Sequence, residues 1–273
     1  MPASMRGQSR DALADLSARL EEALADADAR AVGAELFAVV DLLDSSPALR
    51  RALTDVARPV DDRRSLLSAL LDGKVSEAAG AVAAEAAALS WSRVRDLGDA
   101  IEHVAVLATG LDADRRGTLD EVEDQLHEFA RAADEDTGLA SAFSDRAAPL
   151  ESRQGLVASL TEGRVDDAAA DLIHRAVAAP RAGRVSETVG DFAKVAAELR
   201  SRLVAQVITA TPLDRAQHDR LQAALSRQYG RQVHINVDVV ADLVGGLSIT
   251  VGDDLIDGSM RSRITDARRA LVR

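Results

Sequence analysis

The chain has 273 residues and a net charge of −12; 47% of its residues are hydrophobic, but only 2% are aromatic. The core must therefore be built from Ala, Leu and Val, which favours close-packed helices over a β-sandwich or a β-barrel. There is no cysteine, so disulfides, thiol catalysis and thiolate metal sites are excluded, and an intracellular location is favoured.

The first predicted helix begins at Ser9, which we expect to be its N-cap, and runs to about Ala25. Four leucines at i, i+3, i+7 and i+11 give this helix a single apolar stripe: Leu13, Leu16, Leu20 and Leu24. Residues 1–10 contain no apolar stretch typical of a secretory signal. No part of the chain approaches the roughly 18 apolar residues of a membrane span, so a soluble chain is expected.

A second helix is predicted from about Ala31 to Leu43, and the Ser45-Ser46-Pro47 sequence ends it. Residues 48–108 then predict four short helices, with breaks near Pro59, at Gly73 and around residues 90–92. We expect Asp61 to be an N-cap and Gly73 to be a C-terminal stop. The apolar stripe of the last helix consists of Val94, Leu97, Ile101 and Val104.

The sequence repeats itself at a constant offset of 90 residues. Residues 49–79 align without a gap on residues 139–169, with 12 identities in 31 positions. The identities include the helix-breaking residues, Pro59 with Pro149 and Gly73 with Gly163. Beyond a one-residue slip the match continues to about residue 195. Because breakers shared in register are hard to obtain by chance, we infer an internal duplication.

A stretch rich in small and charged residues, Thr109 to Thr118, is expected to be a linker between the two copies. The predicted helix at 119–132 corresponds to the one at 31–43. The helix at 9–25 has no second version, so one hypothesis is that the helix at 93–108 also packs as the first helix of copy two. The expected domains are helical bundles at 1–110 and 111–200 and a small α/β domain at 201–273.

The last domain begins with a predicted strand at 203–209. Asp214 and Gln217 resemble a capping box at the start of the helix that follows. That helix is expected to stop at Gly230 and to bury three residues, Leu221, Ala224 and Leu225. A second strand at 232–237 alternates, with its apolar side formed by Val233, Ile235 and Val237.

Residues 243–259 predict two short strands joined by a tight turn, in which Gly252 and Asp253 tolerate the positive φ of a hairpin. Ser259 is expected to cap a last helix at 260–272. The predicted fold is mainly α. A duplicated N-terminal helical bundle is followed by a small C-terminal α/β domain, whose mixed sheet is covered by two helices.

The charge is unevenly distributed along the chain. Residues 201–273 hold 10 Arg and 8 Asp, so the acidic excess lies entirely in the first 200 residues. An acidic helical array repels nucleic-acid phosphates and anionic lipids, and it favours partners with basic surfaces. The alternative is that these charges only solvate the exposed helix faces.

The sequence shows no motif for a catalytic, cofactor or metal site. The five histidines have no pair at i,i+3 or i,i+4, and each is expected at the surface: His103, His127, His174, His218 and His234. Gly245-Gly246 and Gly252 form no nucleotide-binding loop. Asp253 and Asp254 are explained by a turn, and Ser259 lies in no nucleophile elbow. The arginines of the last helix have no aromatic neighbour, which disfavours nucleic-acid binding.

A set of C-terminal residues forms a specific signature: Pro212-Leu213, Gln217, Val237-Asp238, Leu243-Val244-Gly245-Gly246, Val251-Gly252-Asp253, Ile256-Asp257-Gly258-Ser259, Arg261 and Arg263. In this spacing the chain resembles the delta subunit of rotary ATP synthases, a bacterial relative of the mitochondrial oligomycin-sensitivity-conferring protein. Met260 and Ser262 depart mildly from the pattern. The large departure is length, because the usual member has one helical domain and this chain has nearly two. Its composition is compatible with an actinobacterial long form.

The resemblance implies a stator subunit with no catalytic site of its own. In the family, the helical domain receives N-terminal helices of the alpha subunits of the catalytic head, and the C-terminal domain holds the b subunits of the peripheral stalk. The head is thereby kept from turning with the rotor during proton-driven ATP synthesis. The resemblance also implies no cofactor, no small-molecule substrate and no nucleic-acid partner. The location implied is the cytoplasmic face of the plasma membrane, reached only through the complex.

The resemblance makes the leucine stripe of the first helix a candidate partner interface: Leu13, Leu16, Leu20 and Leu24. Core packing is the favoured interpretation of that stripe, since every bundle helix needs an apolar face. Which helical copy contacts the head is left open. The alternative function is a free-standing helical-repeat adaptor without a catalytic role, and an enzyme ranks third.

Overall fold

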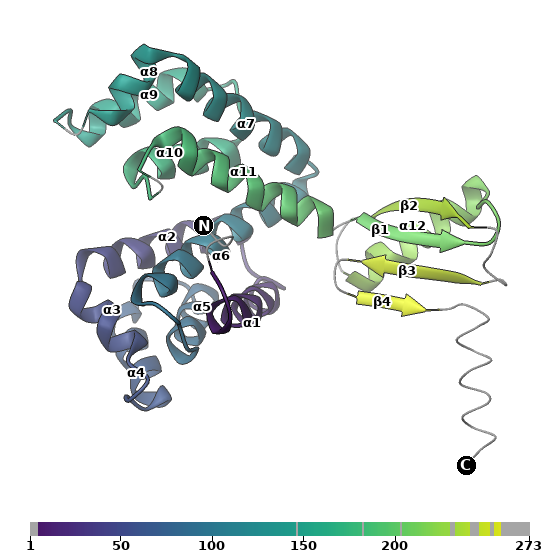
Figure 1. Ribbon diagram of the computed structural model, residues 1–273, viewed down its shortest axis with the longest axis horizontal. Helices are drawn as coiled ribbons and strands as arrows, with labels where there is room; N and C mark the ends of the chain where they lie inside the picture. Colours follow the sequence, from purple (N-terminus) through teal and green to yellow (C-terminus); the bar gives the residue numbers. More distant parts are fainter. Residues whose placement is uncertain are drawn as a thin grey trace. The chain divides into compact units, whose positions relative to one another are not determined.

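The computed structural model describes residues 5–145, 147–181, 183–202, 204–229, 233–240, 246–251 and 254–257. The chain divides into two compact units, Met1–Ala196 and Ala197–Arg273 (Figure 1). The described residues of the first unit form helices, and those of the second combine a helix with a four-stranded sheet. The predicted fold class, mainly α with a small C-terminal α/β domain, is confirmed.

The first unit begins with six helices: α1 (Gln8–Ala23), α2 (Ala29–Ser45), α3 (Pro47–Thr54), α4 (Val60–Leu71), α5 (Glu77–Ala88) and α6 (Val94–Arg116). Short polar side chains start three of them. Asp28, Ser46 and Ser76 each accept a hydrogen bond from the backbone N–H three residues ahead, and so cap α2, α3 and α5.

Two of the predicted helix starts are wrong. Ser9 lies inside α1, where its buried hydroxyl donates to the Asp96 carboxylate at 2.7 Å and accepts the backbone N–H of Ser92 at 2.8 Å. Asp61 lies in the first turn of α4, and Pro59 holds the capping position instead. Tertiary partners decide the role of Ser9, whereas the fixed φ of proline decides where α4 begins.

The linker predicted at Thr109 to Thr118 is also wrong, because α6 is one helix of 23 residues. It ends at Gly117, whose φ of 76° lies in the left-handed region that favours glycine. The small residues that suggested a linker instead allow close packing: a Cβ on Gly33 of α2 would lie 2.7 Å from the hydroxyl oxygen of Thr109. As hypothesised, α6 serves both copies, because it packs against α1, α2, α3 and α5 and also against α7 and α10.

The second copy continues with α7 (Leu119–Glu135), α8 (Thr137–Ser144), α9 (Leu150–Thr161), α10 (Asp167–Ala178) and α11 (Val185–Arg202). The helices α7 to α10 begin and end 90 residues after α2 to α5. The backbone angles agree as well: φ and ψ are −52° and 143° at Pro59, and −53° and 143° at Pro149. Gly73 and Gly163 have φ of 67° and 66°. We therefore call α2–α6 repeat one and α7–α11 repeat two.

The core of the first unit is aliphatic, with an aromatic pair that joins the repeats. Phe37 of α2 and Phe192 of α11 have ring centroids 6.4 Å apart. Of the stripe predicted for α6, only its first residue, Val94, is exposed, at 42%. His103 is buried rather than at the surface, because α6 is covered by helices of both repeats.

The second unit contains β1 (Val204–Thr209), α12 (Arg215–Tyr229), β2 (His234–Val239), β3 (Leu247–Val251) and β4 (Asp254–Asp257). The strand order is β2-β1-β3-β4. The β1 and β2 strands pair in parallel, whereas β1 with β3 and β3 with β4 pair antiparallel, so the sheet is mixed as predicted.

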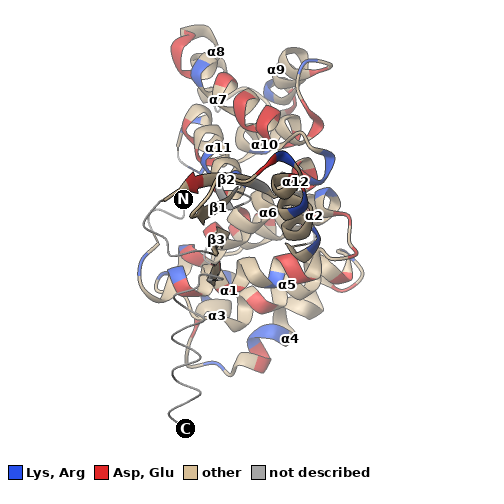
Figure 2. Cartoon of the chain, turned by 90° about the vertical axis from the view of Figure 1, so that its right-hand side faces the viewer, with Lys and Arg blue, Asp and Glu red and all other residues tan. Residues whose placement is uncertain are grey.

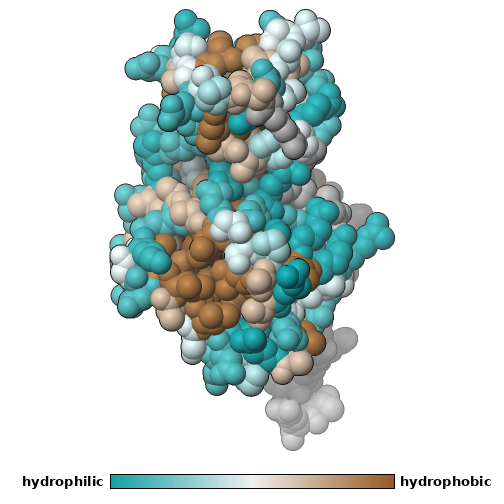
Figure 3. Space-filling model, turned by 90° about the vertical axis from the view of Figure 1, so that its left-hand side faces the viewer, coloured by the Kyte–Doolittle hydropathy of each residue, from teal (hydrophilic) through white to brown (hydrophobic). Residues whose placement is uncertain are grey.

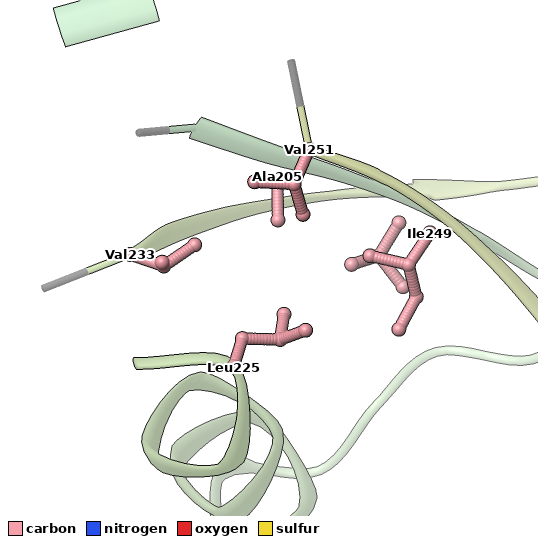
Figure 4. Close-up of a cluster of buried hydrophobic side chains, with 6 residues drawn as sticks. Ala205, Leu225, Val233, Ile249 and Val251 are labelled. Atoms are coloured by element: carbon pink, nitrogen blue, oxygen red, sulfur yellow. The ribbon is translucent and has the colours of Figure 1, made fainter. Parts of the chain in front are cut away.

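The helix α12 covers this sheet. Figure 4 shows Leu225 of α12 pointing at Ala205 of β1, Ile249 of β3 and Val233, the residue directly before β2. The capping box is confirmed: the Asp214 N–H donates to Gln217 Oε1 at 3.0 Å, and the Gln217 N–H donates to Asp214 Oδ1 at 2.7 Å. Ala224, predicted to be buried, is exposed. The predicted last helix at 260–272 lies outside the described residues.

Candidate partner-binding surfaces

Repeat two carries an apolar groove formed by α7, α8, α9 and the turn after α9. Its volume is about 300 Å³. The apolar lining consists of Phe129, Ala132, Leu139, Leu160 and Val165, and Glu128 and Arg164 add one charge of each sign. Phe129 is held in place by Phe143 of α8, with ring centroids 5.8 Å apart. The groove is therefore partly exposed and apolar, and the packing of Phe129 against Phe143 supports its floor.

Repeat one has similar residues 90 positions earlier. The corresponding apolar residues are Val39, Leu42, Leu49, Leu70 and Val75, and Lys74 corresponds to Arg164. All of these apolar residues except Val39 are half-buried. Figure 3 shows hydrophobic surface gathered over the bundle of α1–α5, with smaller areas over the bundle of α7–α10. Each repeat therefore has partly exposed apolar surface.

The leucine stripe of α1 lies in the core of the first unit. Its four members are at most 8% exposed: Leu13, Leu16, Leu20 and Leu24. The helix packs against α5 and α6. Burial agrees with core packing, the favoured of the two interpretations, and contact of the stripe with a partner stays a prediction.

The signature residues that the structure describes serve turns and packing. Leu213 packs against the hydrophobic cluster of the sheet, next to the exposed Pro212. Gly246 has a φ of 86° directly before β3, and Asp257 ends β4 opposite Ser248. Nine other signature positions lie outside the described residues: Leu243, Val244, Gly245, Gly252, Asp253, Gly258, Ser259, Arg261 and Arg263.

The described part of the chain has neither a cluster of metal-binding side chains nor a helix that could span a membrane. It assembles no group of three or more metal-binding side chains. On α7, Nε2 of the exposed His127 lies 4.0 Å from Oε1 of the buried Glu123. Nor does any described helix combine the length and the apolar composition that a bilayer crossing requires.

Acidic residues are distributed along the helices with basic residues between them (Figure 2). Several are neutralised within the chain. The Arg116 guanidinium donates two hydrogen bonds to Asp166, at 2.6 and 2.7 Å, and these bonds hold the pKa of Asp166 at about 2. Arg30 bridges Asp167 and Asp171. Part of the acidic excess is thus used to join helices.

Known proteins resemble this chain over nearly all of its length. The family model described as ATP synthase delta (OSCP) subunit matches residues 105–271. The ATP synthase subunit delta of Kineococcus radiotolerans is 44% identical over 246 residues, which cover 90% of this chain and 89% of that protein. The subunit delta of Thermobifida fusca is 40% identical over 268 residues, which cover 98% of this chain and all of that protein (100%).

Among solved structures, a chain of the Toxoplasma gondii mitochondrial ATP synthase hexamer is 15% identical with a TM-score of 0.31, covering 62% of this chain and 95% of that one. A likeness this low adds nothing to the assignment. The family model matches more than half of the chain, and the curated relatives are similar from the first repeat to the second unit. The chain belongs to the ATP synthase delta (OSCP) subunit family.

Proposed function

We propose that the chain is a stator component of the proton-translocating ATP synthase. It links the peripheral stalk to the catalytic head and resists the torque of the rotor during ATP synthesis. The similarity carries this proposal, since proteins named ATP synthase subunit delta match the chain over both repeats and the second unit. The same similarity disfavours a free-standing adaptor. As a peripheral part of the complex, the chain associates with the membrane on its cytoplasmic face.

The contact with the head is assigned to the groove of repeat two. Family similarity in residues 105–271 includes the whole of repeat two, whereas repeat one lies largely outside that match. A half-exposed trough lined by Phe129, Leu139 and Leu160 suits the apolar face of an amphipathic helix. The proposed occupant is the N-terminal helix of an alpha subunit.

Charged substitutions in the groove test this assignment. The Leu160→Glu variant places a carboxylate in the apolar trough, and we expect its affinity for heads stripped of this subunit to fall by about 30-fold, since losing one buried leucine contact costs about 2 kcal/mol. The corresponding variant of repeat one, Leu70→Glu, tests whether repeat one also binds the head. Ser68→Glu, on the exposed side of α4, is the control. Unchanged binding of the Leu160 variant would contradict the assignment.

The contact with the b subunits is assigned to the second unit. Two large apolar side chains are exposed on its outer strands, Leu255 of β4 at 66% and Val239 of β2 at 50%. Such residues on sheet edges invite a partner. In a pull-down with the soluble part of a b subunit, Leu255→Lys should reduce recovery, whereas Leu160→Glu should leave it unchanged. The reverse pattern would exchange the two assignments.

A further inference from the structure

Six charged side chains meet where repeat two contacts repeat one, and we name them the joint cluster: Asp41 and Asp44 of α2, Asp99 and Glu102 of α6, Arg175 of α10, and Arg181 in the turn after α10. The four acids come from helices of repeat one and the two arginines come from repeat two. Glu102 is fully buried, and Arg175 and Asp99 are nearly so.

The two arginines reach across the junction of the repeats. The Nη1 of Arg175 donates to Asp41 Oδ1 at 2.6 Å, and its guanidinium lies 5.1 Å from the ring centroid of Phe37. Arg181 donates from Nη1 to Asp99 at 2.8 Å and from Nη2 to Asp44 at 2.6 Å. These contacts tie α10 and the turn after it to α2 and α6.

Glu102 lies within ion-pair distance of both guanidinium groups but makes no hydrogen bond to either. Its Oε1 is 3.3 Å from Nε of Arg181 and 3.8 Å from Nε of Arg175. Both of its carboxylate oxygens are buried without a hydrogen-bond partner. An ionised carboxylate is costly in such a position, because nothing replaces the hydrogen bonds that water would donate to it.

Comparison of the repeats shows that the cluster is not part of the pattern that they share. At an offset of 90, or 91 for α6 and α11, five of its six members have a different kind of residue at the corresponding position. Asp41 corresponds to Arg131, Asp99 to Gly190, Glu102 to Ala193, Arg175 to Glu85 and Arg181 to Trp91. Only Asp44 has its like, in Asp134. The cluster is therefore a feature of the contact between the repeats.

We propose that Glu102, with Arg175 and Arg181 facing it, forms a proton-operated joint between the two helical repeats. The joint is closed when Glu102 is protonated and loosens when Glu102 is ionised. The proposal does not depend on the assignment of partners, since it concerns the free chain.

The direction follows from the balance of forces on Glu102. Burial is the largest effect and raises its pKa to about 7, Asp99 and Asp44 add to the rise, and the attraction of Arg181 and Arg175 only partly offsets it. Opening the joint admits water, which returns the pKa towards the ordinary 4.5. The closed form thus binds the proton more tightly. The ratio of open to closed chains should rise on the order of tenfold between pH 6 and pH 8.

Two further arginines pair with the acids that lie beside Glu102. Arg50 of α3 donates to Asp44 at 3.1 Å, and Arg95 of α6 donates to Asp99 at 3.3 Å. A Cβ on Gly98 would lie 3.4 Å from Nη2 of Arg181, so the guanidinium rests directly on the backbone of α6.

Energy transfer between two dyes tests the joint in the full chain. The chain has no cysteine, so Ser65→Cys on α4 and Ser152→Cys on α9, both exposed, place one label on each repeat. The labelled chain should show mainly the closed distance at pH 6 and a growing open population above pH 7. Glu102→Gln should stay closed at both values. Glu85→Gln, which removes the same charge from an ion pair with Arg64, should keep the pH response.

Two results would overturn the proposal. One is a pH response that persists in Glu102→Gln, and the other is a dye-to-dye distance that stays constant from pH 5.5 to 8.5 in the labelled chain with Glu102 intact. If circular dichroism shows that Glu102→Gln misfolds, carbon-13 NMR of the glutamate carboxyls in the parent chain decides instead. One carboxyl should titrate near pH 7. Titration of all glutamates below about pH 5.5 would reject the joint.

Discussion

At the scale of single residues, the duplication provides its own controls. Arg63 of α4 is buried and donates to the carbonyls of Leu53, Ala87, Ala88 and Leu89, so it closes the C-terminal end of α5. Its counterpart Arg153 makes one such bond among the described residues, to Val177 at 3.2 Å. The same residue at the same repeat position therefore carries different amounts of stability.

We expect Arg63→Met to lower the free energy of unfolding by about 3 kcal/mol, because several buried carbonyls lose their donor, and Arg153→Met to lower it by about 1 kcal/mol. Urea unfolding followed by circular dichroism measures both. Fluorescence of Trp91, the one tryptophan of the chain, should follow the loss in repeat one. Equal losses for the two variants would contradict the difference in bonding.

A second residue-scale prediction concerns acid. The hydrogen bonds from Arg116 lower the pKa of Asp166 to about 2, against an ordinary value of 3.8. The folded chain thus holds this proton less tightly than the unfolded chain, so the stability is present above pH 4 and is lost as the pH falls towards 2. Asp166→Asn should cost about 1 to 2 kcal/mol at pH 7 and almost nothing at pH 2. Thermal melts at both values measure the difference, and a loss independent of pH would argue against the ion pair.

At the scale of helices and strands, the sequence predicts the elements better than their ends. The offset of 90 and the pattern of Pro59 and Gly73 are local signals, and the structure reproduces them in both repeats. The prediction of a linker at 109–118 is wrong because small residues also occur where helices pack closely. Its Thr109 faces Gly33 of α2, a contact 76 positions distant that no local pattern reveals. The predicted N-cap role of Ser9 is wrong for the same reason, since its hydrogen-bond partners are Asp96 on α6 and Ser92 just before α6.

Two glycine substitutions separate packing from helix propensity. In Gly33→Ala the new methyl group would lie 2.7 Å from the Thr109 hydroxyl oxygen and 3.1 Å from the Ala105 carbonyl oxygen, so α2 and α6 must move apart. We expect a loss of about 2 kcal/mol. In Gly190→Ala of α11 nothing lies within 4 Å of the new methyl group, and the helix should gain about 0.5 to 1 kcal/mol. Urea unfolding measures both, and opposite signs are the expected outcome.

At the scale of the whole molecule, the candidate sites divide into those with and those without a local signature. The C-terminal signature can be recognised in the sequence itself, because turns and caps depend on residues that are close in sequence. The capping box of Asp214 and Gln217 is an example. The groove of repeat two and the joint cluster cannot be recognised in this way. Leu139 and Leu160 line one groove, and Glu102 comes close to Arg181, only after the helices pack. The acids Asp99 and Glu102 beside the apolar stripe of α6 are visible in the sequence, but they do not indicate which residues they contact.

The helix α6 makes the two repeats interdependent, which a truncation tests. Leu97, Ile101 and Val104 are fully buried, in a helix that packs against four helices of the first bundle and against α7 and α10. A chain that begins at residue 93 would expose much of this apolar surface. We expect it to bind a hydrophobic dye and to unfold without a sharp transition, whereas a chain ending at residue 196 should unfold as cooperatively as the parent's first unit. A cooperative, monomeric fragment from residue 93 would instead support separable bundles at 1–110 and 111–200, since repeat two would then need no cover from repeat one.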